Sequence, residues 1–295
     1  MSEDLALGKG IQARLLLDSV NPVGCRLRTF VLKYPRFIHA EVMTHRQWSR
    51  SSSSSRAIPI EKMIDRVMDD PAMPVYWGRN RKGMQALEEL GMLSRTDAEK
   101  VWLDLRDEAV MGVRALSRIG LHKQIANRPL EPWMHIVVIA STTTTSNFYA
   151  LRDHPDAQPE IRALARAMRE VEEASGPALL KPGEWHLPFI SAEERAEHPI
   201  ETLRKISVAR CARVSYLTHE GERCVAKDVE LHDRLLEQRP LHASPGEHVA
   251  QALGSRERIG NFIGWRQYRK SGRLLELEAA PQEFFEKVEG KWRMR

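Results

Sequence analysis

Apolar and polar residues alternate along the chain from residue 26, and this alternation predicts a β-strand. Pro35 interrupts the strand because proline has no N–H group to donate to a sheet. The apolar positions between Pro35 and residue 43 predict the start of a helix that leads into a run of serines. Beyond this run, residues 60–68 predict a short helix, and a loop rich in proline and glycine follows over residues 70–83.

A long amphipathic helix has the clearest pattern of the whole chain. Apolar residues recur at steps of three and four from Trp102 to Leu116, which is the spacing of one helix face. Thr96 and Glu99 have the spacing of a capping box at its start, and Gly120 is placed to end it. The pattern therefore predicts a helix that begins at Thr96 and ends before Gly120.

The remaining segments predict shorter elements. Apolar and β-branched residues fill 131–150, which suits either a buried strand or a buried helix. Pro159 stands at a helix-start position. The expected elements are a helix over 160–173, irregular structure over 175–200, a strand or helix start over 206–216, a helix over 229–238 and a loop-rich basic segment at the end.

Composition indicates a globular protein. The chain has 295 residues, 42% of them hydrophobic and 29% charged, which is enough for a full core. The formal net charge of +5 and the isoelectric point near 9.2 favour anionic ligands. Because no basic block is interleaved with aromatic residues, we expect no duplex-binding surface. No apolar run approaches the length of a membrane span, so no membrane partner is expected.

The three cysteines, Cys25, Cys211 and Cys224, have neither paired nor metal-type spacing. We therefore expect free thiols, no metal, and a cytoplasmic location, and the first residues do not resemble a signal peptide. Cys211 lies between Arg210 and Arg213 in the sequence. Basic residues on both sides make it the candidate for an activated thiolate nucleophile.

The segment from Thr44 to Arg56 combines three arginines and a histidine with a run of serines. Arginine offers a planar fork of donors to phosphate oxygens. Serine hydroxyls and closely spaced backbone N–H groups can complete a cradle for an anion. The same composition also fits a flexible linker with solvated charges. The surrounding sequence favours anion binding.

Two further segments carry polar residues at the ends of apolar stretches. Asn147 and Arg152 lie in Asn-Phe-Tyr-Ala-Leu-Arg, and Ala-Gln-Pro-Glu-Ile follows at 157–161. The third segment joins Ala-Arg-Val-Ser at 212–215 with His-Ala-Ser-Pro-Gly-Glu-His at 242–248.

Together the three segments resemble the flavin-dependent thymidylate synthase family. The hallmark of that family is Arg-His-Arg followed by Ser-x-Arg, and its other signatures are Asn-Phe-x-x-Leu-Arg and His-x-Thr-Pro-x-Glu-His. The matching positions are His45, Arg46, Ser54, Arg56, 147–161, 212–215 and 242–248, with Ser244 in place of threonine.

The order of these segments differs from the typical family member, in which the third signature comes first. We interpret the difference as a circular permutation, so that 206–250 corresponds to the amino-terminal part of the family domain. The resemblance then implies one domain over 1–295. Its expected fold is α+β, with an antiparallel or mixed sheet and a bundle of long helices.

The resemblance also implies roles for particular side chains. Arg152 would be catalytic, because it would hydrogen-bond the uracil ring and stabilise the charge that develops there. The other implied residues are Ser54, Ser55, Arg56 and Arg128 for the nucleotide, and His45, Arg46, Asn147, His242 and Ser244 for the flavin. The positions that depart from the family pattern are Glu41, Thr44, Ser51, Ser52, Ser141 and Thr143.

Plainer interpretations exist for the same residues. Arg56 could be a solvated loop charge, Arg152 could pair with Asp153 or Asp156, and His45 could be a satisfied buried histidine. His242 and His248 could form a metal pair, although no further ligand stands at metal spacing.

The activity implied by the resemblance is methyl transfer to C5 of dUMP to give dTMP. Reduced FAD would supply hydride, methylenetetrahydrofolate the carbon unit, and NADPH the reducing power that regenerates the flavin. A homotetramer with shared active sites is expected. The alternatives are alkylation or hydroxymethylation of another pyrimidine nucleotide, and a nucleotide- or nucleic-acid-binding relative that has lost catalysis.

Overall fold

The structure of the chain is a computed structural model that describes residues 7–214, 224–236, 241–272, 274, 285–288 and 291–294. Ser215, the last residue of the Ala-Arg-Val-Ser segment, lies outside the described residues. Among the described residues, no helix is both long enough and apolar enough to cross a membrane.

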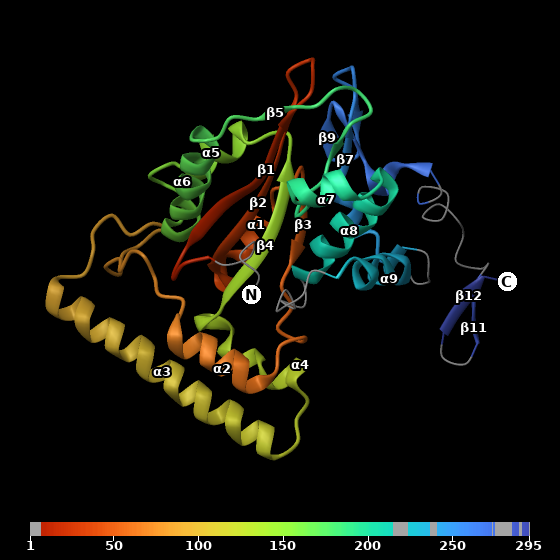
Figure 1. The fold of residues 1–295 in the computed structure, drawn as a ribbon. Coiled ribbons are helices and arrows are strands. Elements are labelled where there is room, and N and C mark those ends of the chain that lie inside the picture. Colours follow the sequence, from red (N-terminus) through yellow and green to blue (C-terminus); the bar gives the residue numbers. More distant parts are fainter. Residues whose placement is uncertain are drawn as a thin grey trace.

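A five-stranded sheet forms the centre of the molecule (Figure 1). Its strands are β1 (Gln12–Val20), β2 (Arg26–Pro35), β3 (Ser49–Ser52), β4 (His135–Thr142) and β5 (Ala178–Leu179). Their order is β3-β4-β2-β1-β5, with antiparallel pairing throughout except between β1 and β5, which are parallel. The sheet is therefore mixed.

The helices lie on both faces and at one edge of this sheet. They are α1 (His39–Val42), α2 (Ile60–Asp69), α3 (Met92–Arg118), α4 (Lys123–Ala126), α5 (Ser146–Arg152), α6 (Pro159–Glu173), α7 (Ala192–Glu197), α8 (Ile200–Arg213) and α9 (Val225–Leu236). Short 3-10 helices are η2 (Arg36–Ile38), η3 (Arg128–Trp133), η5 (Ser244–Glu247) and η6 (Tyr268–Lys270). The short strands are β6 (Trp185–His186), β7 (Ala250–Ala252), β8 (Arg258–Ile259), β9 (Phe262–Ile263), β10 (Trp265–Gln267), β11 (Phe285–Val288) and β12 (Lys291–Met294).

Alternation along β2 and β4 builds a separate core on each face of the sheet. Phe30 and Val138 point to one face, where α1, α5 and α6 supply further apolar side chains. Val31 and Ile139 point to the other face, against α2, α3 and η3. Because a shift of one residue would exchange the two sets, the alternation also fixes the register of the strands.

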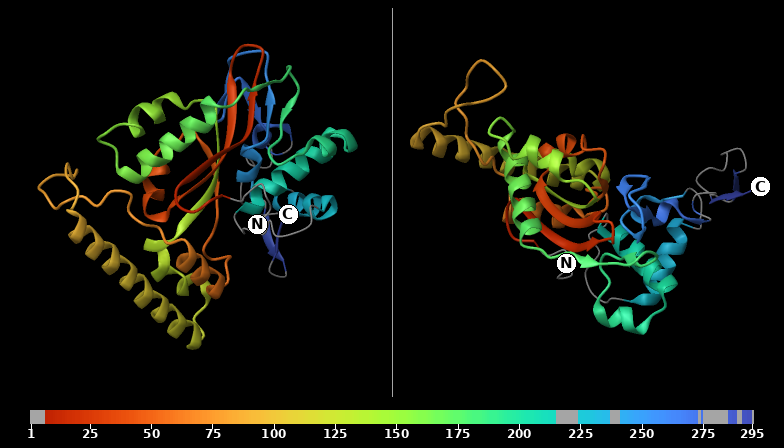
Figure 2. Two further views of the ribbon diagram at one scale, coloured as in Figure 1. Left: turned by 60° about the vertical axis from the view of Figure 1, so that its left-hand side comes forward. Right: turned by 90° about the horizontal axis from the view of Figure 1, so that it is seen from above.

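The described residues from Trp185 to Leu274 form a second unit that lies beside β3 and reaches the turn between β1 and β2 (Figures 1 and 2). Its helices α7, α8 and α9 are joined by Arg210, which donates to both Glu194 and Asp228. A small sheet in the order β10-β7-β6 completes the unit. The 3-10 helix η5 packs against β3, so this late part of the chain lies beside the serine run.

The predicted α+β class, the mixed sheet and the long helices are confirmed. The predicted start of the longest helix is wrong, because α3 begins at Met92 after Gly91. Thr96 lies inside the helix, and its hydroxyl donates to the carbonyl of Met92 one turn earlier. Gly120 has a positive φ of 89°, as expected of the residue that follows a helix end.

Other predicted elements are changed by their neighbours. The first half of the serine run is a strand, because β4 offers it an edge to pair with. The apolar stretch 131–150 divides into β4 and α5, and the segment 175–200 contains α7. The helices at the end of the chain, α8 and α9, begin earlier than the pattern predicted, at Ile200 and Val225.

Candidate functional site

The predicted site residues gather around β3, at its two ends and along its free edge. His45, Arg46, Asn147 and Arg152 lie at the end where the strand begins, and Ser54, Ser55, Arg56 and Arg128 lie beyond the end where it finishes. The segment that contains His242 and Ser244 runs beside the strand.

At the first end, Arg152 contacts His45 directly. The Nε of Arg152 donates to Nε2 of His45 at 3.1 Å. Arg152 is the last residue of α5, and that helix is held in place by buried Phe148 and by the Tyr149 hydroxyl, which donates to Glu172 at 2.7 Å. The His45 ring lies edge-on to Phe148, with 4.8 Å between ring centroids. Packing therefore fixes both partners of the pair.

No carboxylate neutralises Arg152 in the part of the chain that the structure describes. Asp153, the adjacent residue, is paired with Arg166 at 2.9 Å and with Arg169 at 2.7 Å. Asp156 faces His154 instead. The alternative of a structural ion pair with either aspartate is thus wrong, and Arg152 keeps its positive charge available for a ligand.

His45 is neutral at physiological pH. Burial lowers its pKa to about 4, and the positive charges of Arg152 and Arg50 add to the effect. Since its Nε2 accepts from Arg152, the proton of the neutral ring resides on Nδ1. His45 therefore offers a donor to a ligand while it orients the arginine.

Arg46 and Asn147 complete this end of the strand. Both are exposed, and within the described ranges neither side chain has a hydrogen-bond or ion-pair partner. Asn147 lies near the start of α5, and Arg46 lies in the turn between α1 and β3. They are exposed donors near the His45–Arg152 pair, since Arg46 follows His45 in the sequence and Asn147 lies on the same helix as Arg152.

At the other end of β3, the loop that follows the strand is held in place by side chains from α4 and from the residue after it. Asn127 donates its side-chain amide to the carbonyls of Ser55 and Ile58, at 2.9 and 3.0 Å, and Lys123 donates to the carbonyl of Ala57 at 3.0 Å. Arg56 is exposed at the tip of this loop. Sequence reasoning missed Asn127, although it directly precedes the predicted Arg128.

Arg128 and Ser55 differ from the other members of this group. Arg128 is exposed on η3 next to Asn127, and it pairs with Glu131 at 2.5 Å. The side chain of Ser55 is buried and lines a cavity behind the loop, together with Ser53. Ser54 is half-buried and does not line that cavity. Of the serines, only Ser54 is placed with Arg56 outside the cavity.

One chain does not bring Arg152 and Arg56 together. They lie beyond opposite ends of β3, and the four residues of that strand alone span roughly 13 Å at about 3.3 Å per residue. The polar groups predicted for the flavin and the catalytic step are thus separated from those predicted for the phosphate.

His248 anchors the late segment to β3. It is fully buried, its Nε2 is 3.0 Å from the hydroxyl of Ser51, and its Nδ1 is 2.9 Å from the hydroxyl of Ser141. Gln267 adds a second link, since it donates to Ser49 and to the carbonyl of Glu247. His242 and Ser244 remain exposed at the other end of the segment. The first and third signatures, distant in sequence, therefore lie side by side.

His242 and His248 do not form a metal pair. Both ring nitrogens of His248 are engaged by serine hydroxyls, whereas His242 is exposed. Among the described residues, no three histidine, cysteine, aspartate or glutamate side chains are grouped to hold a metal ion.

A chain of buried hydrogen bonds extends from His248 across the sheet, and sequence reasoning missed it. From Ser141 it passes to the hydroxyl of Thr29 at 2.7 Å, then to Nε2 of His186 at 2.9 Å, and from Nδ1 of His186 to Ser19 at 2.9 Å. The available signal was the placement of hydroxyl residues in otherwise apolar strands. Ser51 and Ser141, which depart from the family pattern, are thereby explained as partners of His248.

The two histidines in this chain of hydrogen bonds predict that the folded protein loses stability in acid. Burial lowers the pKa of both His186 and His248 to about 3, from 6.5 in the unfolded chain. Between pH 3 and pH 6.5 the unfolded state therefore binds more protons than the folded state. The free energy of unfolding consequently falls as the pH drops below 6.5. Urea unfolding at several pH values should show a slope of roughly 1.4 kcal/mol per pH unit for each buried ring. A His248→Gln variant should have a shallower slope, and an unchanged slope would contradict the assignment.

Cys211 is not an activated nucleophile. Its side chain is fully buried and burial raises the pKa of its thiol. The neighbouring Arg210 is held by Glu194 at 2.6 Å and by Asp228 at 3.0 Å, so it cannot stabilise a thiolate. Cys211 therefore supplies no nucleophile to the site around β3.

Comparison with known proteins identifies similar sequences and structures. A family model described as Thy1, thymidylate synthase complementing protein, matches residues 27–177. A UMP/dUMP methylase, PolB from Streptomyces cacaoi, is similar in its crystal structure with 5-Br UMP, at 17% identity and a TM-score of 0.48, over 58% of this chain and 92% of that chain. Its structure with 5-Br dUMP aligns at 21% identity and a TM-score of 0.43, over 50% of this chain and 67% of that chain. No curated protein matches.

Proposed function

The chain belongs to the Thy1 family, the flavin-dependent thymidylate synthases, and from this membership we propose that it transfers a methyl group to C5 of dUMP to give dTMP. The proposed carbon donor is methylenetetrahydrofolate, with NADPH as the source of reducing power. The observation that carries the proposal is the pair formed by Arg152 and neutral His45. Arg152 is a fixed cation with no carboxylate partner among the described residues.

Such a cation suits the chemistry of a pyrimidine ring. Attack from C5 requires negative charge to build up on the uracil, and a preorganised guanidinium stabilises that charge without reorganising during the reaction. His45 holds the guanidinium in orientation through its Nε2. Because Phe148 packs against the His45 ring, the orientation is maintained before any ligand binds.

The donor set at the same end of β3 fits a flavin dinucleotide. Arg46 offers a guanidinium to a pyrophosphate, and Asn147 and Nδ1 of His45 offer neutral donors. His242 and Ser244 would contribute from the segment beside the strand. When bound, FAD would supply hydride, while these residues bind it and orient the nucleotide.

The phosphate of the nucleotide is assigned to the loop after β3. Arg56 and Ser54 present donors at its tip, Arg128 lies nearby in an ion pair with Glu131, and Asn127 holds the loop backbone in place. Because this loop and Arg152 lie at opposite ends of β3, we assign a complete active site to a homotetramer. In that assembly the loop of one copy would face Arg152 of another.

Arg56→Ala should weaken binding of dUMP by about 10- to 100-fold, the cost of a lost charge-assisted hydrogen bond to phosphate. Isothermal titration calorimetry with dUMP and with deoxyuridine measures the effect, and deoxyuridine, which has no phosphate, should bind both forms equally. Arg118→Ala is the control, because Arg118 is also exposed but lies at the end of α3. Equal loss for deoxyuridine would contradict a role in phosphate binding.

The activity itself is tested in two steps. Purified protein, as isolated or after incubation with FAD, should show the absorbance bands of bound flavin; protein that cannot be reconstituted would contradict any flavin-dependent reaction. Tritium release from C5-labelled dUMP, UMP and dCMP then identifies the substrate. Release from UMP or dCMP alone would replace thymidylate synthesis by modification of another pyrimidine nucleotide. The cause would then be the positions that depart from the family pattern, Glu41, Thr44, Ser51 and Ser52.

A further inference from the structure

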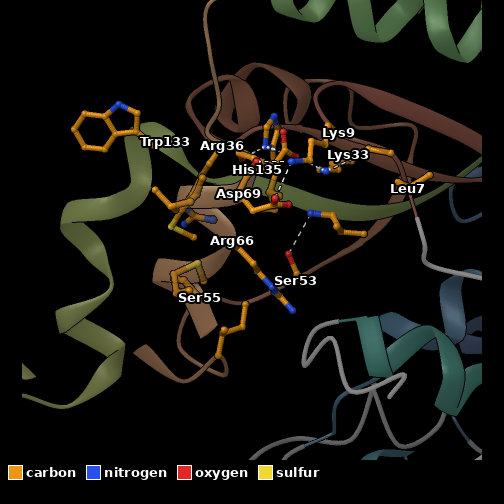
Figure 3. Close-up of a pocket in the computed structure, with 18 residues that line it drawn as sticks. Leu7, Lys9, Lys33, Arg36, Ser53, Ser55, Arg66, Asp69, Trp133 and His135 are labelled. Atoms are coloured by element: carbon orange, nitrogen blue, oxygen red, sulfur yellow. Dashed lines mark hydrogen bonds and ion pairs between the residues drawn. The ribbon is translucent and has the colours of Figure 1, made fainter. Parts of the chain in front are cut away.

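Two cavities border the elements that carry the site, and they differ in whether their polar side chains have partners. The first, of about 320 Å³, lies behind the loop after β3 (Figure 3). Lys9 and Lys33 line it, and each is paired with an aspartate, at 2.7 and 2.5 Å. The second is a groove of about 1330 Å³ along α6, and Arg152 is among the residues that line it. Because this α6 groove contains the proposed catalytic arginine, its other polar groups bear on the substrates.

The α6 groove has one wall on α6 and the other on residues 75–87, which belong to the connection from α2 to α3 (Figure 1). Two hydrogen bonds hold the walls together. Glu160 accepts from the backbone amide of Val75 at 2.9 Å, and Gln85 donates to the carbonyl of Asp156 at 2.9 Å. The apolar lining residues are Tyr76, Met84 and Leu87 on one wall and Ala163 and Ala167 on the other. Apolar walls held at a fixed spacing suit a flat ring.

The charges along the α6 groove disfavour an acidic group inside it. The lining residues with carboxylates are Glu41, Asp156, Glu160 and Glu170. Of the lining arginines, Arg166 is already paired with Asp153 at 2.9 Å, and Arg152 is the cation assigned to the uracil. An anion would therefore meet repulsion from the carboxylates. A neutral ring with polar edges fits this lining better than an acid does.

Gln158 and Arg162 line the same groove and carry polar atoms that no group of the described chain satisfies. Both side chains are half-buried, and the Oε1 of Gln158 and the Nε of Arg162 are buried without a hydrogen-bond partner. The backbone amide of Arg162 donates to the carbonyl of Gln158 at 3.0 Å, so the two residues stand one turn apart at the start of α6. Buried polar atoms without partners are rare, and a bound ligand explains them.

We propose, on the basis of the function proposed above, that Gln158 and Arg162 bind the lactam edge of the pteridine ring of the carbon donor. A lactam places an N–H donor beside a carbonyl acceptor. The Oε1 of Gln158 accepts from the N–H, and the guanidinium of Arg162 donates to the carbonyl. The groove exceeds the range of about 300 to 1,000 Å³ that is typical of a site for one small ligand, so it has room for this ring beside the uracil at Arg152. The acidic tail of the donor extends into solvent.

The test compares folate with aminopterin, which has an amino group in place of the carbonyl oxygen on its pteridine ring. The two probes carry the same acidic tail, and at neutral pH both rings are uncharged, so only the lactam edge differs. The wild-type chain, loaded with FAD and dUMP, should bind folate at least about tenfold more tightly. In aminopterin the amino group turns a donor toward Arg162, and the ring lacks the N–H that Gln158 accepts. Isothermal titration calorimetry measures both affinities.

Arg162→Met and Gln158→Met should each bring the affinities for the two probes closer together, because each variant removes one half of the lactam contact. Arg169→Met is the matched control. Arg169 is also an arginine of α6, but it is paired with Asp153 at 2.7 Å and does not line the groove. Its loss should leave the preference for folate unchanged. Because the probes are also compared on the wild type, the proposal stays testable if a variant fails to fold.

Three results would overturn the proposal. Equal affinity of the wild type for folate and aminopterin would show that no lactam edge is recognised. An unchanged preference in both Arg162→Met and Gln158→Met would remove these residues from the ring site. Loss of discrimination between dUMP and dCMP, with the folate preference intact, would assign the pair to the nucleotide. Tritium release from dUMP without folate selectivity would overturn this inference alone, whereas folate selectivity without tritium release would support the ring site and contradict the proposed reaction.

Discussion

Replacement of Arg152 by alanine is expected to lower kcat for methyl transfer by about 10²- to 10³-fold, the effect of removing one preorganised donor from a site of developing charge. The absorbance of bound flavin should persist, because Arg46, Asn147 and His45 remain in place. Stopped-flow or tritium-release measurements give the rate. Loss of flavin together with the rate would show that Arg152 binds the cofactor instead of acting on the uracil.

The contact with His45 supplies a second measurement for the same variant. The charge of Arg152 is one cause of the low His45 pKa, so Arg152→Ala should raise that pKa from about 4 toward the ordinary value. Two-dimensional NMR of the histidine rings measures the shift. Arg152→Lys keeps a cation but not the planar fork, so it should recover only part of the rate.

Arg204→Ala is the control for Arg152. Arg204 is also a half-buried helical arginine, but it lies on α8 and its guanidinium stacks over Trp185 at 4.8 Å. Its loss should affect stability through packing and leave turnover and the His45 pKa unchanged. An equal fall in rate for both variants would point to a general loss of structure.

Replacement of His248 by alanine is expected to reduce the free energy of unfolding by about 3 to 5 kcal/mol. The change removes a fully buried ring and leaves the hydroxyls of Ser51 and Ser141 without their partner. Buried polar groups without partners are costly because water cannot reach them. Urea unfolding followed by circular dichroism measures the loss.

His242→Ala is the matched control from the same sequence signature. His242 is exposed, so its replacement should change stability by less than about 0.5 kcal/mol. His248→Phe separates the two parts of the His248 effect, because it restores volume but not the hydrogen bonds. If His248→Phe is as stable as the wild type, the hydrogen-bond chain contributes nothing and the assignment fails.

The two histidines show why the site could be predicted only in part. They lie six positions apart in one motif, and the sequence alone allowed them to be a metal pair. The fold gives them opposite environments, since η5 presses His248 against β3 and leaves His242 at the surface. Burial depends on contacts between Ser51, Ser141 and a segment more than a hundred residues away, which periodicity cannot reveal.

The serine run illustrates the same limit. Composition left it open between a linker and an anion cradle, and the structure divides it into a strand, a cavity wall and a loop. Its strand exists because β4 provides a free edge, and its loop is shaped by Asn127. Each of these partners comes from a different part of the chain.

The sequence by itself determined most of the long helix α3, the helix α6 and the alternating strand β2, because these follow from local periodicity, whereas the α+β class was implied by the family resemblance. It also determined the family signatures, since they are matters of residue type and spacing. Only the tertiary structure decided that His45 holds Arg152, that Asp153 is taken by other arginines, and that Arg152 and Arg56 lie at opposite ends of β3. Those outcomes depend on which side chains from distant parts of the chain pack against each other. That packing is decided only when helices cover the two faces of the sheet and η5 covers the β3 edge.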